Sequence, residues 1–289
     1  MRHMFICFLL TLFLNCIIFI PTDVKSEQKT IFLQQEELKS YALTEWEQGY
    51  INWNKLDELL EQLQSEVSEP PKNATLGEGL QIIEEDSGVS LDRAAFTINF
   101  LEAFYKGEDS SIQVPKKTVY ARVDKEMLKE ITRKKLGSYT TFYNSTNKER
   151  STNIMLSAKA MHGTVIFPGE VFSFNKTVGE RTEKRGYKKA PVIVKGEFAE
   201  DIGGGICQVS STLFNAVDLR GIQMIERFTH SRSVPYVPPG RDATVSWWGP
   251  DFSFKNLYNE PIVITARAAY GSLTVEVFSS ETVEHFQDK

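Results

Sequence analysis

The stretch that most constrains the fold is a run of three glycines leading into a cysteine. Gly203, Gly204 and Gly205 lie just before Cys207, which opens an apolar pattern with helical spacing. We therefore predict that a glycine-rich turn delivers Cys207 to the first turn of a helix, and that this helix stops at Gly221. Unpaired backbone N–H groups and the positive end of the helix dipole stabilise a thiolate there.

A histidine and a carboxylate follow this cysteine. His230 lies 23 positions after Cys207, and Asp242 lies 12 positions after His230. Such a set has the composition of an activated nucleophile with its base and orienting group. A helix followed by two short strands would bring the three side chains together, so we name them the candidate triad. A structural role is the alternative, because cysteine is often a buried small hydrophobe and glycines also serve tight turns.

The N-terminus has the pattern of an export signal. Arg2 supplies the positive start, residues 4–20 form an apolar run, and residues 24–26 resemble a cleavage site before Glu27. We predict a cleaved signal peptide. An uncleaved membrane anchor is the main alternative, since the apolar run is near the lower limit for a span. The mature protein is thus predicted to be extracytoplasmic, secreted or associated with the cell envelope.

Cysteine usage and charge limit the function classes. Cys7 and Cys16 lie in the predicted signal, which leaves Cys207 as the only cysteine of the mature chain. No intramolecular disulfide can then form, and a lone thiol outside the cell is a candidate reactive group. The histidines have no paired ligand spacing, so we predict no metal site and no cofactor. A net charge of −5 argues against a nucleic-acid partner.

The order of predicted elements gives an α+β fold class. We divide the chain into a signal (1–26), a helical segment with a linker (27–69), a small α+β module (70–145), a larger α+β domain (146–280) and a tail (281–289). Mainly antiparallel strands are expected in the larger domain.

Four of these strands are specific expectations. Residues 165–167 and 171–174 flank Pro168 and Gly169 and are predicted to pair as a hairpin. Residues 243–247 are predicted to form a strand, and residues 262–269 are predicted to form another.

The larger domain resembles a known family. The matching text includes PGEVFSFNKTVGERTEKRGYKK, DIGGGICQVSSTLFNAV and HSRSVPYVPPGRDATVSWWGPDFSFKN. Residues 168–278 are similar to the VanW domain, named after an accessory protein of some vancomycin-resistance clusters. Residues 70–145 resemble a weaker version of the peptidoglycan-binding module that precedes this domain in many relatives. The resemblance implies an exported bacterial cell-envelope protein, with peptidoglycan, a cell-wall peptide or an envelope protein as its partner.

A fainter resemblance concerns the chemistry. Gly205, Ile206 and Cys207 at a helix start, followed by a histidine and an aspartate, are similar to the pattern of transglutaminase-like and papain-type thiol enzymes. The interval from Cys207 to His230 is short, and no HxW-type sequence follows the histidine. The likeness is therefore an analogy of chemistry and not a fold assignment.

The first functional hypothesis is a cell-wall enzyme in which Cys207 attacks an amide of a stem peptide. His230 would act as base and Asp242 would orient its imidazole. The backbone N–H of Cys207 would stabilise the oxyanion, with Gln208 as a second donor. Supporting roles fall to two further side chains, Ser210 and Ser211.

Substrate binding in this hypothesis rests on two arginines and the glycine turn. Arg181 and Arg241 are candidates for a substrate carboxylate, which a guanidinium group binds bidentately. The substrate would pass Gly203, Gly204 and Gly205. An ordinary structural ion pair is the alternative for either arginine.

The second hypothesis is a non-catalytic module that binds peptidoglycan or a partner protein. Cys207 and His230 would then be structural, and Tyr236, Trp247 and Trp248 would form a surface for sugars or a partner. The reactivity of Cys207 in the folded protein separates the two hypotheses.

Overall fold

The computed structural model describes residues 29–44, 49–194 and 197–285. The α+β class is confirmed, since helices alternate with small antiparallel sheets. The predicted signal at residues 1–26 lies outside the described residues. Within the described ranges, no helix combines the length and the hydropathy that a membrane crossing requires.

The fold contains two compact units that interleave along the sequence. Among the described residues, the first unit comprises those up to Val67 together with Leu91–Lys117, and the second comprises Ser68–Ser90 together with those from Thr118 onward. These units cut across the division that we predicted after residues 69 and 145. That division into sequence domains stays a prediction.

The first unit is built on helices with apolar faces. Leu56, Leu60 and Leu63 recur at helical spacing and pack with Phe96 and Phe100 in one core. The elements of this unit are β1 (Thr30–Leu33), α1 (Gln35–Lys39), α2 (Trp53–Val67), α3 (Arg93–Lys106) and β5 (Ser110–Gln113). Strands β1 and β5 pair antiparallel.

Short elements precede the main sheet in the chain. They are β2 (Thr75–Leu76), η1 (Glu78–Leu80), β3 (Ile82–Ile83), β4 (Gly88–Leu91), β6 (Lys116–Val119) and α4 (Lys125–Ile131). Strand β2 pairs with β3, and β4 pairs with β6.

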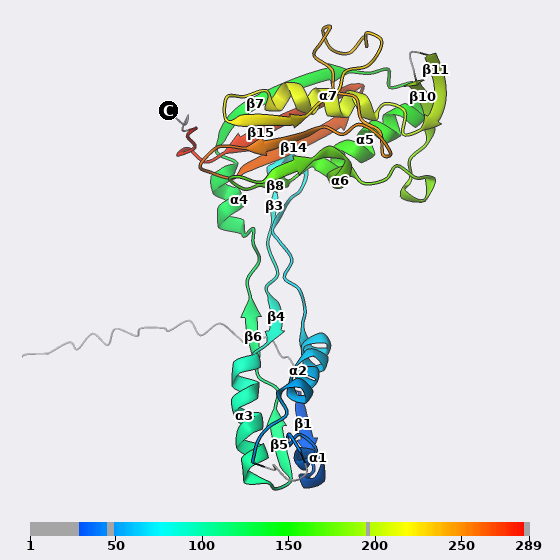
Figure 1. Ribbon diagram of the computed structural model, residues 1–289. Coiled ribbons are helices and arrows are strands. Elements are labelled where there is room, and N and C mark those ends of the chain that lie inside the picture. Colours follow the sequence, from blue (N-terminus) through cyan, green and yellow to red (C-terminus); the bar gives the residue numbers. More distant parts are fainter. Residues whose placement is uncertain (1–28, 45–48, 195–196, 286–289) are drawn as a thin grey trace, which may run out of the picture. The chain divides into compact units, whose positions relative to one another are not determined.

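The centre of the second unit is a four-stranded antiparallel sheet in the order β7-β15-β14-β8. Its strands are β7 (Lys134–Phe142), β8 (Thr164–Ile166), β14 (Ile262–Ala269) and β15 (Ser272–Ser279). Two helices, α5 (Lys148–Met161) and α7 (Ile206–Val217), pack against this sheet and against each other (Figure 1).

Both faces of the sheet are buried. Ile262 and Ile264 belong to the core under α5 and α7, whereas Val263 and Phe278 pack with the residues of α4 on the opposite face. This alternation follows from the two-residue period of a strand. It explains why the sequence of β14 is almost continuously apolar.

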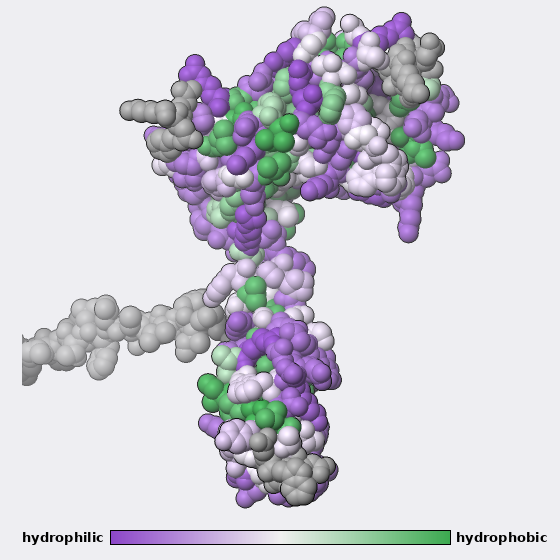
Figure 2. Space-filling view, in the orientation of Figure 1, coloured by the Kyte–Doolittle hydropathy of each residue, from purple (hydrophilic) through white to green (hydrophobic). Residues whose placement is uncertain are grey.

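The visible outer surface is mainly hydrophilic, and hydrophobic residues form only small patches on it (Figure 2).

Close contacts with β7 fix the helix that carries Cys207. A Cβ atom on Gly137 would lie 2.2 Å from the carbonyl oxygen of Ala216, so glycine permits the close approach of α7. Thr141 and Thr212 share a buried hydrogen bond of 2.8 Å between the same two elements. These contacts position α7 against the sheet.

The second unit also contains the remaining elements. They are β9 (Val171–Ser173), α6 (Phe174–Val178), η2 (Glu183–Arg185), β10 (Lys189–Val194), β11 (Glu197–Ile202), β12 (Ile222–Glu226) and β13 (Ser253–Asn256). Strands β10 and β11 form an antiparallel hairpin, and a second sheet has the order β12-β13-β9.

The predicted hairpin at residues 165–174 is wrong. Strand β8 pairs with β14, and β9 pairs with β13, so the two segments belong to different sheets. Gly169, at φ 78°, donates its N–H to the carbonyl of Asn256. The turn is therefore fastened to a distant segment and directs its two strands apart.

Two further local predictions fail. Helix α7 ends at Val217, where Asp218 leaves the helical conformation, and not at Gly221. A Cβ on Gly221 would lie 2.4 Å from the Tyr258 ring, so this glycine serves packing. Residues 243–247 form no strand, because Thr244 makes only an isolated bridge and the chain then turns.

We predict that Gly204→Ala destabilises the second unit. Its Cβ would lie 2.5 Å from the carbonyl oxygen of Ala190 and 2.7 Å from that of Pro191, and both are backbone atoms. Overpacking of this kind costs about 1–3 kcal/mol. Urea unfolding should therefore show a lower midpoint than the wild type.

The matched control is Gly249→Ala, whose Cβ would have its nearest neighbour at 3.4 Å. Its unfolding free energy should stay within about 0.5 kcal/mol of the wild type. Equal midpoints for the two variants would contradict the tight packing of the glycine turn.

Candidate functional site

The glycine turn places Cys207 at the start of α7. Gly203 and Gly205 adopt φ values of 92° and 107°, which other residues rarely take. Cys207 is the second residue of the helix, so its backbone N–H has no partner within the helix. The turn also packs between two arginines, since a Cβ on Gly203 would meet Arg181 at 3.2 Å and one on Gly205 would meet Arg150 at 3.0 Å.

The structure brings the candidate triad together. One carboxylate oxygen of Asp242 accepts the ring N–H of His230 at Nδ1 (2.6 Å) and also its backbone N–H (2.6 Å). The His230 ring also makes a side-chain hydrogen bond with Cys207. As a neutral thiol, Cys207 donates to the carbonyl oxygen of Val245 at 3.4 Å. The order nucleophile, imidazole, carboxylate expected of an activated thiol is present.

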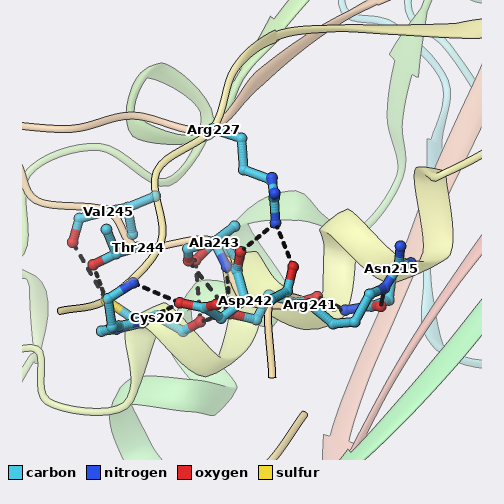
Figure 3. A network of polar contacts seen from close by, with 12 residues as sticks. Cys207, Asn215, Arg227, Arg241, Asp242, Ala243, Thr244 and Val245 are labelled. Atoms are coloured by element: carbon cyan, nitrogen blue, oxygen red, sulfur yellow. Dashed lines mark hydrogen bonds and ion pairs between the residues drawn. The ribbon is translucent and has the colours of Figure 1, made fainter. Parts of the chain in front are cut away.

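The segment around Asp242 is fastened to α7 by hydrogen bonds (Figure 3). Ser211 Oγ donates to the carbonyl of Cys207 at 2.6 Å and accepts the N–H of Ala243 at 2.9 Å. Ser210 Oγ donates to the carbonyl of Ala243 at 2.6 Å. Arg227 donates to the carbonyl of Asp242 at 2.9 Å. These bonds hold the carboxylate in register with the cysteine.

A single backbone contact places His230 opposite Asp242. The N–H of Thr244 donates to the carbonyl of Phe228 at 2.8 Å, so the chains on either side run antiparallel there. His230 lies two residues after Phe228, and Asp242 lies two residues before Thr244. The imidazole and the carboxylate therefore lie opposite each other. Their side chains are only 7% and 9% exposed, which protects the pair from water.

The electrostatics favour a thiolate–imidazolium pair. Burial acts to raise the pKa of Cys207, but the hydrogen bond and the charge of His230 outweigh it, and the pKa is lowered. Burial acts to lower the pKa of His230, yet its bonds to Cys207 and Asp242 raise that pKa. Burial acts to raise the pKa of Asp242, and the two hydrogen bonds from His230 reverse this, so the carboxylate stays ionised.

The thiol faces a cavity of about 960 Å³. Cys207 and His230 line it together with a set of cationic and aromatic residues. These include Arg150, Arg181, Tyr236, Trp247 and Trp248. A cavity of this volume accommodates a peptide-sized ligand.

Of the two arginines predicted to bind substrate, Arg181 lines the cavity and Arg241 does not. Arg181 lines the cavity, donates from Nη2 to Asn175 at 2.7 Å, and has a buried Nη1 without a partner among the described residues. The Arg241 guanidinium binds Asp218 and Asn215 and lies outside the lining. This placement does not support a substrate-binding role for Arg241.

Gln208 is buried and already committed to structural bonds. Its side-chain amide donates to Thr141 Oγ1 and to the carbonyl of Phe142, each at 3.0 Å. Its side chain therefore has no spare N–H for an oxyanion, and only its backbone remains a candidate. Ser210 and Ser211 contact the backbone rather than the cavity. Of the three glycines, Gly203 and Gly205 line the cavity, and Gly204 supports the turn from behind.

Sequence reasoning missed Arg150. It lies on α5 and donates from Nη2 to the side-chain oxygen of Gln208 at 2.9 Å. Burial lowers its pKa, as it does for Arg181, but both groups stay charged at neutral pH. One feature of the sequence could have indicated a role for Arg150, which lies in the first turn of α5. The helix dipole disfavours a cation at that position, so its presence there needs another reason.

Metal binding finds no support in the part of the chain that the structure describes. No group of three or more histidine, cysteine, aspartate or glutamate side chains there could hold an ion.

Comparison with known proteins identifies the family. Residues 149–278 match the family model described as "VanW like protein", and residues 47–113 match one described as "Putative peptidoglycan binding domain". The chain is 51% identical over 233 residues to the protein YoaR of Bacillus subtilis, which is described as uncharacterized; the match covers 81% of this chain and 77% of the relative.

The second relative is the vancomycin B-type resistance protein VanW of Enterococcus faecalis. It is 32% identical over 109 residues, which cover 36% of this chain and 40% of that protein. No solved structure matches the chain. The chain belongs to the VanW family, and its two family matches associate it with the cell wall.

We predict that Cys207 reacts with a small alkylating reagent at unusually low pH. Its lowered pKa keeps thiolate present below the ordinary range, whereas a thiol of pKa ~8.5 is only about 0.3% ionised at pH ~6. In His230→Ala the thiolate loses its cationic partner. Alkylation at pH ~6 should then slow by about tenfold for each unit by which the pKa rises.

His285→Ala is the control, because His285 packs beside Tyr258 and does not line the cavity. Its alkylation profile should coincide with that of the wild type. A thiol that stays inert until the protein is denatured would contradict an activated Cys207.

Proposed function

We propose that this protein is a thiol enzyme that breaks amide bonds in the peptides of peptidoglycan and passes the acyl group to water or to a second amine. The observation that supports the proposal most is the hydrogen-bonded set of Cys207, His230 and Asp242 beside a peptide-sized cavity. The match to a peptidoglycan-binding family model supports the choice of substrate.

The chain's own groups account for each step. The thiolate of Cys207 attacks the amide carbonyl carbon, and the backbone N–H of Cys207 at the helix start stabilises the oxyanion. The imidazolium of His230 then gives its proton to the leaving amine, which departs and leaves a thioester. Water or an amine next attacks the thioester while His230 takes its proton, and the thiolate is restored. Asp242 holds the imidazole in the required orientation throughout.

Two arginines give the site a preference for an anion. Arg150 and Arg181 lie against opposite glycines of the turn that carries Cys207, and both interact electrostatically with its thiolate. The unpartnered Nη1 of Arg181 is a buried donor that an acceptor would satisfy. A carboxylate of the stem peptide, near the bond that breaks, supplies such an acceptor.

The experiment is a turnover assay on purified stem peptides. Each peptide is offered with a free or an amidated carboxyl terminus, and mass spectrometry separates hydrolysis from transfer. We expect turnover by the wild type, none by Cys207→Ala, and a KM about tenfold higher for the amidated peptide, as for the loss of one charge-assisted contact.

The unfolding midpoint of Cys207→Ala should match that of the wild type, which shows that the loss is chemical. Absence of turnover by wild-type protein with an alkylation-competent thiol would refute the enzymatic proposal. Equal KM values for the two peptides would contradict recognition of a substrate carboxylate and leave the rest of the proposal unaffected.

We also infer that the protein is exported and that its signal is cleaved. The basic and apolar pattern of residues 1–26 supports this inference. In a secreting host the mature protein should begin at Glu27, as read by N-terminal sequencing. Retention of Met1 on a membrane-bound product would show an uncleaved anchor.

A further inference from the structure

Two tryptophans at the cavity are unusually exposed. Trp247 is 36% and Trp248 is 88% exposed, although both line the cavity that holds Cys207. Their rings meet edge to face with centroids 6.1 Å apart. An indole ring as exposed as that of Trp248 contributes little to the core, and clustered exposed aromatics mark sites of recognition.

The turn that presents these rings is fixed by hydrogen bonds. The N–H of Ser246 donates to the carbonyl of Pro250 at 2.8 Å, and that of Gly249 donates to the carbonyl of Ser246 at 3.3 Å. Asn175, which is buried, donates to the carbonyls of Ser246 (2.9 Å) and Pro250 (3.3 Å). The backbone that carries the rings is therefore held in place before any ligand binds, which lowers the entropic cost of binding.

The same asparagine links the turn to the peptide part of the site. Its side-chain oxygen accepts a hydrogen bond from Arg181 at 2.7 Å. Asn175 thus fixes the position of Arg181, in the polar part of the cavity, and that of the turn that carries the two tryptophans. The two parts of the cavity have different chemistry, cationic near the thiol and apolar at the tryptophans.

Chain length sets the spacing between these parts. Val245 contacts Sγ of Cys207 through its carbonyl oxygen, and Trp248 follows three residues later. Three residues span at most about 10 Å of backbone. A stem peptide held at Cys207 can span a similar distance. The sugar to which this peptide is attached would then reach the tryptophans.

We propose that Trp247 and Trp248 form a subsite for a sugar ring of the peptidoglycan glycan, beside the peptide subsite at Cys207. A pyranose ring has an apolar face of C–H groups that packs flat on an indole, and its hydroxyl rim stays in water. The inference rests on the proposed function for the identity of the polymer. It adds that the protein distinguishes a peptide attached to sugar from the same peptide alone.

The test measures binding to the full chain carrying Cys207→Ala, which removes turnover. Calorimetry compares a disaccharide-peptide from digested peptidoglycan with the same peptide lacking the sugars. We expect the disaccharide-peptide to bind at least about tenfold more tightly. A second substitution, Trp248→Ala, should abolish this difference and leave the Kd of the free peptide unchanged.

Trp53→Ala is the matched control, since Trp53 is 58% exposed on α2 in the first unit. On the Cys207→Ala background it should preserve the tenfold difference. Loss of the difference in Trp53→Ala but not in Trp248→Ala would overturn the inference and place sugar recognition in the first unit.

The outcomes also separate this inference from the proposed function. Equal Kd values for the two ligands would overturn the sugar subsite even if the wild type turns over peptides. A preference for the disaccharide-peptide that depends on Trp248, in a protein without turnover, would support the subsite and refute the enzyme.

Discussion

The carboxylate of Asp242 is the contact on which the site depends. One oxygen accepts both the backbone N–H and the ring N–H of His230, so it fixes the position and the tautomer of the imidazole together. The proton on Nδ1 leaves Nε2 for the sulfur. Because the pair is shielded from water, its charges act on Cys207 in a medium that screens them weakly. Loss of this one acceptor would disorganise the geometry and the electrostatics at once.

The bonds that hold Asp242 come from the helix that carries the nucleophile. Ser210 and Ser211 contact the backbone of Ala243, so hydrogen bonds connect the helix of the cysteine to the segment of the carboxylate. That helix is in turn fixed to the central sheet through Gly137 and Thr212. A chain of contacts thereby connects the site to the central sheet, and sites supported by regular elements hold their geometry more precisely than sites on loops.

Patterns that are local in sequence were predictable, and contacts between distant segments were not. The strand at residues 262–269 was predicted to the residue, because burial on both faces leaves an almost continuous apolar run that ends at a turn. The order of Cys207, His230 and Asp242 suggested their meeting, and the structure places them in contact. Their catalytic role remains a proposal. The hairpin after Pro168 failed because its turn is bonded to Asn256, far along the chain. Arg150 was missed for the same reason.

The glycine turn shows how one local motif can carry several constraints. Positive φ values at Gly203 and Gly205 bend the chain into α7, and the absent side chains leave room for the stems of Arg181 and Arg150. A larger residue at either position would both strain the backbone and displace a guanidinium group from the thiol. The motif therefore couples the direction of the helix to the charge around its first turn. This coupling explains why the glycine pattern predicted the position of Cys207 but not the approach of Arg150 to Gly205.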